Sequence, residues 1–427
     1  MTPQDPLHRR RRSARGWLRA LGPGFITGAS DDDPSGIGTY AQTGAQFGYT
    51  QLWTALFTLP FMIAVQEMCG RIGLVTGKGL AGVIRKYYSK RILWVALTLL
   101  LAANTINIGA DLGAMAASLQ LIIGLPFPVL ILAMTILTLV LEVFVSYRTY
   151  ANVLKYFALT LLAYVLTGLL TRQDWGAILL NTFIPHLSFD RGQIQNIVAL
   201  LGTTISPYLF FWQAGEEVEE EVAEGRLRVM GRGKPRFGKG DIRTMQKDTI
   251  AGMAFSNVIT FFIIMTAAST LYRSGVTQID TAAQAAEALR PLAGNATSVL
   301  FALGVIGTGL LAVPVLAGSA SYALSEALVW REGLYRKFAQ AHGFYGIITI
   351  ATLAGLAINF TNVPPFRLLY DTAILNGIVA PPLIILIILI ARNQRIMGQY
   401  VNSRLSTTLG IGIAVIMALC GVLMFVI

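Results

Sequence analysis

The feature that most constrains the fold is a series of apolar segments that runs through almost the whole chain. Eleven segments are long enough to cross a bilayer, which takes about 20 residues of helix. They are 17–44, 47–70, 92–123, 127–146, 152–171, 194–222, 248–271, 296–326, 342–361, 368–391 and 406–427. Only 13% of the 427 residues are charged, against about 25% in a soluble domain. The sequence therefore predicts an all-α polytopic membrane protein with eleven transmembrane helices.

Basic residues are concentrated on one side of these segments. With a cytoplasmic amino terminus, the amino-terminal arm and the cytoplasmic connections hold 28 of the 33 Lys and Arg residues. These connections are 71–91, 148–155, 216–247, 331–337 and 392–404. Because positive charge is retained in the cytoplasm, we expect a multi-pass protein of the bacterial plasma membrane. The net charge of +11, including that of the basic arm 1–16, is assigned to orientation and not to nucleic-acid binding.

The first apolar segment is interrupted by three acids and a proline. Asp31, Asp32 and Asp33 stand directly before Pro34, although carboxylates at membrane depth are costly. Pro34 removes a backbone donor and Gly36 loosens the chain, so we expect the helix to break here. Broken helices with polar groups near the midplane form the cation sites of secondary transporters. Asp33 is the predicted centre of the site, while Asp31 and Asp32 are expected to line the pathway or to cap the next half-helix.

The sixth apolar segment predicts a second break. It carries Gly202, Thr203, Thr204, Ser206 and Pro207 in its middle. Interrupted first and sixth helices fit a five-plus-five inverted repeat. A single transporter domain is then expected. Its parts are a first repeat 17–171, a second repeat 194–391 and an extra helix 406–427.

Three sequence motifs resemble one known family. GPGF…DPSG, from Gly22 to Gly36, is similar to the first-helix signature of the NRAMP divalent-metal transporters, and GTTISPY is similar to their sixth-helix signature. RIGLVTGKGL, from Arg71 to Leu80, resembles the loop that follows their second helix. The resemblance covers most of the chain and implies a LeuT-type fold.

The resemblance also implies the site residues. Asp33 matches the family's aspartate, whereas Gly36 replaces its asparagine, Ser206 its methionine and Tyr208 its histidine. The implied metal ligands are Asp33, Gly36, Ser206 and the carbonyl groups of Ser30 and Thr203. Family members also place polar tenth-helix residues near the metal, so Asn376 is expected to line the pathway.

The departures from the family pattern bear on the choice of metal. Hydroxyls, carbonyls and water suit hard ions, while a thioether suits softer ones. Mg²⁺ keeps several waters, so a roomy oxygen-only site fits it. The departures resemble the NRAMP-related magnesium transporter branch. We therefore expect import of a hydrated hard divalent cation, Mg²⁺ and also Mn²⁺; the alternative is a proton-coupled Mn²⁺ or Fe²⁺ importer of the ordinary NRAMP kind.

Proton coupling depends on polar residues of which few remain. Asp111 matches the family's third-helix aspartate, but Ala114 replaces a glutamate three positions later. Tyr208 replaces the histidine, and a tyrosine hydroxyl does not titrate near neutral pH. The segment 342–361 lacks the arginines that family members have there. These losses predict transport with weak proton coupling or none.

Other polar residues are given structural roles. Glu67 lies four residues before Arg71, a spacing that predicts an ion pair on one helix. Asn104 and Asn107 are expected to form hydrogen bonds between helices. The acidic residues from Glu216 to Glu224 either line a vestibule or form a solvated helix end.

Other classes of protein fit less well. A sodium-coupled amino-acid transporter of the same fold is disfavoured because three aspartates oppose a substrate carboxylate. No nucleophile–base pair indicates an enzyme, so no catalytic residue and no cofactor is expected. The expected partners are the transported ion and the lipid bilayer; a monomer is compatible with the sequence, which does not determine the oligomeric state.

Overall fold

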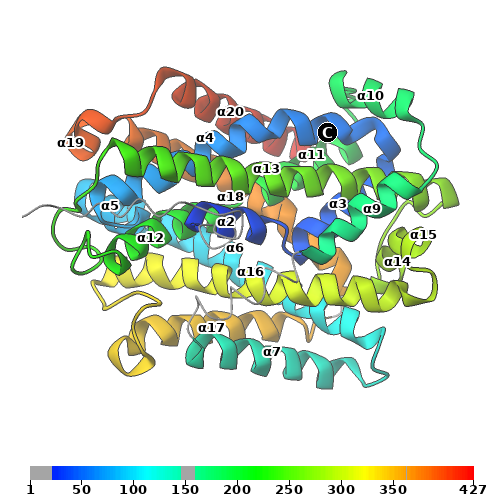
Figure 1. Cartoon of the computed structure of the whole chain (residues 1–427), viewed down its shortest axis with the longest axis horizontal. Helices are drawn as coiled ribbons and strands as arrows, with labels where there is room; N and C mark the ends of the chain where they lie inside the picture. The colour runs from blue at the N-terminus through cyan, green and yellow to red at the C-terminus, as the bar shows by residue number, and fades with distance from the viewer. Residues whose placement is uncertain (1–21, 146–158, 362) are drawn as a thin grey trace, which may run out of the picture.

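The computed structural model describes residues 22–145, 159–361 and 363–427, and its regular elements are helices. The helices form one bundle in which several of the longest run nearly parallel and others lie obliquely to them (Figure 1). In chain order they are α2 Pro23–Asp31, α3 Pro34–Phe47, α4 Leu52–Thr76, α5 Leu80–Tyr87, α6 Lys90–Gln120, α7 Phe127–Phe144, α9 Leu162–Leu170, α10 Trp175–Phe183, α11 Arg191–Thr204, α12 Pro207–Ala223, α13 Lys239–Thr270, α14 Ala282–Ala286, α15 Arg290–Ala293, α16 Thr297–Leu328, α17 His342–Ile358, α18 Pro365–Ala391, α19 Gln394–Met397 and α20 Arg404–Val426.

Eight helical stretches of the described residues are long and apolar enough to cross a membrane, and two shorter apolar helices accompany them. This confirms an all-α membrane architecture, but it does not confirm the count of eleven. One reason is that α3 continues through a short 3-10 turn into α4, so that Pro34–Thr76 forms one stretch. Another is that the expected segment 152–171 lies partly outside the described residues, as do the basic arm 1–16 and the connection 148–155.

One helix begins well before its apolar segment. α13 starts at Lys239 and not at 248, because its first turns are polar and gave no apolar signal. The Asp241 carboxylate accepts a hydrogen bond from the Gly238 amide at 2.7 Å, which stabilises the start of the helix. The connection expected over 216–247 is therefore mostly helical at both of its ends.

Both predicted helix breaks are present, and each lies beside a close helix contact. α2 crosses α13 so closely that a Cβ on Gly28 would lie 2.3 Å from the Gly252 carbonyl. α11 approaches α18 in the same way, since a Cβ on Gly202 would lie 2.0 Å from the Ala373 oxygen. Glycines permit such backbone contact between membrane helices. Larger side chains at these positions would separate the helices next to each break.

The first turn of α2 is held by a residue distant in sequence. Asp248 of α13 accepts hydrogen bonds from the amides of Gly22 at 3.1 Å, Gly24 at 2.7 Å and Phe25 at 3.3 Å. The first amides of a helix have no partner within it, and a carboxylate there also interacts favourably with the helix dipole. Asp248 therefore acts as the cap of α2.

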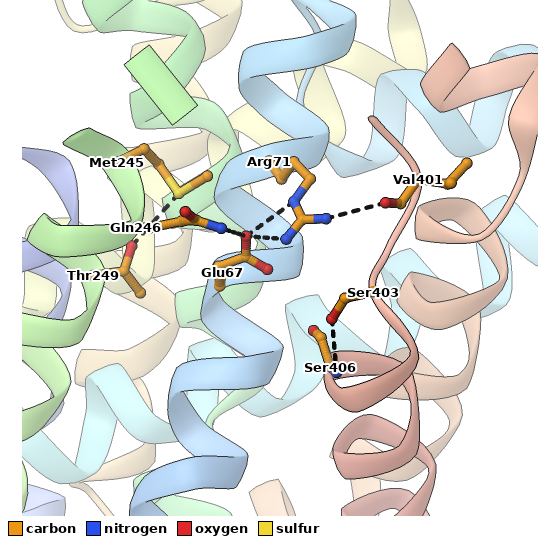
Figure 2. A network of polar contacts seen from close by, with 8 residues as sticks. All are labelled: Glu67, Arg71, Met245, Gln246, Thr249, Val401, Ser403 and Ser406. Atoms are coloured by element: carbon orange, nitrogen blue, oxygen red, sulfur yellow. Dashed lines mark hydrogen bonds and ion pairs between the residues drawn. The ribbon is translucent and has the colours of Figure 1, made fainter. Parts of the chain in front are cut away.

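The predicted Glu67–Arg71 ion pair is confirmed. Arg71 Nε donates to Glu67 Oε1 at 2.9 Å, and the same oxygen accepts from Gln246 of α13 at 2.9 Å. Arg71 also donates to the Val401 carbonyl at 3.3 Å. Figure 2 shows that the pair lies between α13 and the segment leading to α20. It joins three elements at one end of the bundle.

The acidic end of α12 is partly buried in the protein and is not simply exposed to solvent. Glu217, Glu219 and Glu221 are all buried. Glu217 accepts from Gln213 at 3.0 Å, and Glu219 accepts from the Leu334 amide at 2.8 Å and from the Tyr322 hydroxyl. The Glu219 carboxylate thus connects α12 to α16 and to the connection that follows α16.

Candidate functional site

The first helix break places a carboxylate at the start of a half-helix. α2 ends at Asp31, and Asp32 has a non-helical backbone with φ −85° and ψ 46°. Asp33 is the N-cap of α3, and Pro34 occupies the first turn, where its missing N–H is not needed. The sequence breaks the helix here because aspartate caps and proline starts a helix far better than either continues one.

Asp33 is buried and accepts hydrogen bonds on both oxygens. Its Oδ1 accepts from the Ser35 hydroxyl at 2.7 Å and from the Gly36 amide at 2.6 Å. Its Oδ2 accepts from Asn107 Nδ2 of α6 at 3.0 Å and lies 3.4 Å from the Tyr208 hydroxyl. The carboxylate is 1% exposed. Four donors from three elements thus fix its orientation, and Asn107 makes the interhelical bond expected of it.

Tyr208 connects the two breaks. It is the second residue of α12, and its hydroxyl donates to the Ser30 carbonyl at 2.9 Å. The Ser30 oxygen and the Asp33 carboxylate therefore meet at one phenol group. We define the Asp33 group as Ser30, Asp33, Asn107 and Tyr208. Three of the four are residues that the sequence predicted for the site.

Gly36 lies in the first turn of α3, and its amide donates to Asp33 Oδ1 at 2.6 Å. A Cβ there would lie 3.0 Å from the Asp31 carbonyl oxygen and 3.3 Å from Tyr40 Cε2. In this structure Gly36 therefore orients Asp33, and its backbone carbonyl is the atom it has to offer a cation. The assignment of Gly36 to the metal ligands stays a prediction.

The second break is differently arranged. α11 ends at Thr204, and Ser206 precedes Pro207 as the N-cap of α12. The Ser206 hydroxyl lies 2.8 Å from both the Gly202 and the Thr203 carbonyl oxygens. In the described part of the chain neither Ser206 nor Thr203 has a hydrogen bond to the Asp33 group. The two residues that the resemblance paired with the metal are bonded to each other instead.

Asp31 and Asp32 face α13, a helix that the sequence analysis did not connect with the site. The Ser256 hydroxyl lies 2.7 Å from Asp31 Oδ2 and 3.1 Å from Asp32 Oδ1. Both aspartates are fully buried. Ser256 was missed because a serine in an apolar helix has many possible roles, and only the packing of α13 on α2 brings it to the break.

Asp111 lies one helical turn beyond Asn107 on α6, on the same face. It is fully buried, and among the described residues neither of its carboxylate oxygens has a hydrogen-bond partner. Asp33 is a charged neighbour of this carboxyl group. The structure thus brings the predicted Asp111 close to the Asp33 group without joining it to that group.

A polar pocket lies at the end of the bundle toward which α3 points. It has a volume of about 350 Å³, and Gln42, Gln46, Tyr370 and Asp371 are among its lining residues. Gln42 is nine residues after Asp33, or about 13 Å along α3 at 1.5 Å per residue. This outer pocket offers amide and carboxylate oxygens along the line from the protein surface to the break.

Two hydrogen bonds beside this pocket join α3, α11 and α18. Thr43 of α3 donates to Asn196 Oδ1 of α11 at 2.9 Å, and Tyr370 of α18 donates to the same oxygen at 3.2 Å. The predicted Asn376 lies further along α18; it is buried, and its amide nitrogen has no partner among the described residues. Asn376 is thus placed on a helix that lines the pocket, but it does not contact the Asp33 group.

Known proteins share this fold. The structure matches the crystal structure of a manganese transporter from Eremococcus coleocola, solved with an aromatic bis-isothiourea compound, with a TM-score of 0.73 at 16% identity, covering 98% of this chain and 87% of that one. It also matches Mhp1, a nucleobase-cation-symport-1 family transporter, with a TM-score of 0.58 at 13% identity, covering 95% and 91%. The expected LeuT-type fold is confirmed.

Sequence comparison identifies relatives over nearly the full length. The chain is 26% identical over 421 residues to a protein of Deinococcus radiodurans named divalent metal cation transporter MntH, covering 97% of this chain and 91% of that protein. It is 26% identical over 433 residues to the protein of the same name from Bacillus subtilis, covering 99% and 95%. The model of the Nramp family, described as natural resistance-associated macrophage protein-like, matches residues 24–427. The chain therefore belongs to the Nramp family, a family of transporters and not of enzymes.

Proposed function

We propose that this protein carries a divalent metal cation across the plasma membrane by alternating access, with its amino terminus in the cytoplasm. The observation that supports this most directly is the Asp33 group. A buried carboxylate, a free lone pair of a helix-end carbonyl and a phenol hydroxyl converge where two broken helices meet. Such helix breaks are where transporters bind ions.

Asp33 and Ser30 are the proposed ligands in this conformation. The Tyr208 hydroxyl has one hydrogen, which it donates to the Ser30 carbonyl at 2.9 Å, and it lies 3.4 Å from Asp33 Oδ2. The hydroxyl must therefore turn away, or offer its own oxygen, when a cation binds. Asn107 has an amide oxygen without a partner among the described residues, which makes it a further oxygen donor beside Asp33. The Thr203 carbonyl and the Ser206 hydroxyl oxygen each keep a lone pair beside their mutual hydrogen bond, so both remain proposed ligands if the second break moves toward Asp33.

Manganese is the first ion to test. The relatives' names fit the alternative reading, a manganese importer of the ordinary Nramp kind, better than they fit a magnesium carrier. Magnesium remains the second candidate, because the Asp33 group presents oxygen donors, and oxygen ligands accept Mg²⁺ as well as Mn²⁺. The preference between the two stays a prediction.

Proton coupling can be tested in the same uptake experiment that tests the metal. Tyr208 in place of a histidine argues for weak coupling, whereas the buried Asp111 beside Asp33 offers one group that could exchange a proton. Purified protein in liposomes should take up Mn²⁺ under a fixed membrane potential, with internal pH recorded at the same time. Mg²⁺ and Ca²⁺ are then added separately and in competition with Mn²⁺.

Asp33→Asn is the decisive variant, and Asp190→Asn is its matched control. Both remove one carboxylate from the N-cap of a helix and leave a side chain that caps well. Uptake should be lost in the first and kept in the second. If neither Mn²⁺ nor Mg²⁺ enters wild-type liposomes, or if Asp33→Asn transports normally, divalent-metal transport through this site is wrong.

A further inference from the structure

A second pocket lies at the opposite end of the bundle from the outer pocket. It has a volume of about 550 Å³ and is formed by α5, by the connection from α12 to α13 and by the end of α16 with the residues after it. These elements lie on the left of Figure 1. We call it the basic pocket, after the six cationic side chains among its lining residues: Lys78, Arg85, Lys86, Arg232, Arg331 and Arg336.

The cations of the basic pocket are not neutralised by the protein. In residues 22–145, 159–361 and 363–427, none of the six forms an ion pair with a carboxylate. Three contacts are nevertheless recorded: Lys78 donates to the Gly231 carbonyl, Arg336 donates to the Glu332 carbonyl at 3.0 Å and Lys86 lies over the Tyr87 ring. Arg85, Arg232 and Arg331 are exposed, and Arg85 interacts with the Glu326 carboxylate without forming a direct ion pair in the described residues.

The two acids that line the pocket do not cancel this charge. Glu326 is buried and accepts from the amides of Gly79 at 2.5 Å and Gly82 at 2.9 Å, so it serves the start of α5. Glu332 is 7% exposed. Its burial, reinforced by the Glu326 carboxylate, raises the pKa of the Glu332 carboxyl well above the ordinary value. Glu332 therefore contributes less negative charge than an exposed glutamate would.

The backbone that presents the arginine side of the pocket is held in an uncommon conformation. Val329, directly after α16, has φ 61° and ψ 34°. Among the residues that the structure describes, it is the one non-glycine residue with a positive φ. This region is unfavourable for a β-branched residue. The turn reverses the chain after α16, so that Val329, Trp330 and Arg331 all line the pocket.

The surroundings of the pocket fit the level of lipid headgroups. Leu328, Val329, Trp330 and Tyr335 are between 37% and 57% exposed. Tryptophan and tyrosine concentrate at membrane–water interfaces. α5 is amphipathic, with Arg85 and Lys86 in its last turn, and lies between the ends of long apolar helices. Basic pockets at this level bind anionic lipid headgroups.

From these observations we infer that the basic pocket is a binding site for a phosphate-bearing anion, either the headgroup of an anionic phospholipid or a soluble phosphate. The planar guanidinium groups of Arg85, Arg232 and Arg331 match the geometry of phosphate oxygens. The volume is within the range of small-molecule sites, about 300–1,000 Å³. This inference does not depend on which ion the protein transports.

The test is native mass spectrometry of the purified full chain in detergent, titrated with phosphatidylglycerol or phosphatidylcholine. Wild type should retain phosphatidylglycerol about tenfold better, because phosphatidylglycerol is a net anion, whereas the choline cation of phosphatidylcholine cancels the charge of its phosphate, and basic side chains at a membrane surface favour anionic lipid. The triple variant R85Q/R232Q/R331Q should lose that advantage. The matched control R243Q/R395Q/R404Q removes three exposed arginines of the same end that do not line the pocket, and it should bind within about twofold of wild type.

Inorganic phosphate separates the two sources. If millimolar phosphate displaces phosphatidylglycerol from the wild type, the pocket takes the soluble anion. If phosphate does not displace this lipid, the pocket takes the headgroup. Both results support the site. Equal losses in the two triple variants would show general surface charge and overturn it.

A folding defect would not leave the inference untested. R85K/R232K/R331K keeps the charge and should retain most of the binding, and the thermal midpoint of each variant is measured alongside. Should the glutamine triple not fold, the three single variants are each expected to weaken phosphatidylglycerol retention about two- to threefold. Single variants that bind as wild type would overturn the inference equally.

Discussion

The two helix breaks of this molecule have the same form and different contents. At the α2–α3 break the carboxylate of Asp33 accepts hydrogen bonds from α3, α6 and α12, so its partners come from across the bundle. At the α11–α12 break the Ser206 hydroxyl is hydrogen-bonded to carbonyls in the last turn of α11. The hydrogen bonds of Asp33 therefore reach neighbouring helices, whereas those of Ser206 stay within the α11–α12 break.

Charged side chains and close packing are distributed unequally between the two breaks. The acids Asp31, Asp32 and Asp33 all belong to the first break, and the second contributes the Tyr208 phenol and a close glycine contact with α18. Under the proposed function, the first break supplies the negative charge that attracts the cation, and the second contributes a phenol hydroxyl and the packing of α11 against α18.

The largest expected effect is that of Asp33→Asn. It keeps the shape of the first break but removes its charge, so metal affinity should fall by about 100-fold or more, as expected for loss of a charged ligand. Isothermal titration with Mn²⁺ measures this. Near-normal affinity would mean that Asp31 or Asp32 carries the charge of the site.

Gly202→Ala should disturb the second break without touching any ligand. Its Cβ would lie 2.0 Å from the Ala373 oxygen, so α11 and α18 must separate, at a cost of about 1–3 kcal/mol as in overpacked cores. A lower thermal midpoint is expected. Gly412→Ala is the control, since a Cβ there lies 3.7 Å from its nearest neighbour, Phe61 Cε1. Equal midpoints for the two variants would contradict the close contact.

Tyr208→Phe should have a moderate effect. It removes the hydroxyl that joins Ser30 to Asp33 and leaves the ring in place. One hydrogen bond contributes about 0.5–1.5 kcal/mol, so uptake should change by about two- to tenfold. The direction distinguishes two roles: a loss indicates that the phenol oxygen binds the ion, and a gain indicates that the hydroxyl must be displaced.

Ser206→Ala should have the smallest effect. Its hydroxyl is bonded to the last turn of α11 and not to the Asp33 group, so Mn²⁺ uptake is expected to stay within about twofold of wild type. Uptake by the variant and by wild type is compared at several Mn²⁺ concentrations. A large loss of affinity would show that Ser206 turns toward the ion in another conformation, and the contrast between the breaks would then apply only to the one described.

The sequence predicted those parts of the site that depend on local chemistry. Aspartate or serine directly before a proline favours the start of a helix, so the breaks at Asp33 and at Ser206 were both predictable, and the matching motifs placed Tyr208. Ser256 was not predictable, because its role depends on which helix packs against α2. Ser206 and Thr203 were assigned by resemblance, which cannot show whether a hydroxyl faces the site or its own backbone. The start of α13 was missed because its polar turns carry no apolar period.

The uninterrupted helix α13 has a consequence for motion. It holds the first turn of α2 through Asp248, contacts its middle at Gly28, and approaches α3 so closely that a Cβ on Gly44 would lie 2.3 Å from the Ile264 oxygen. Both halves of the broken helix, α2 and α3, thus pack against the single continuous helix α13. In the proposed alternating-access mechanism, access to Asp33 would then arise from displacement of other helices against this assembly, and the ion would stay with the helices that move least.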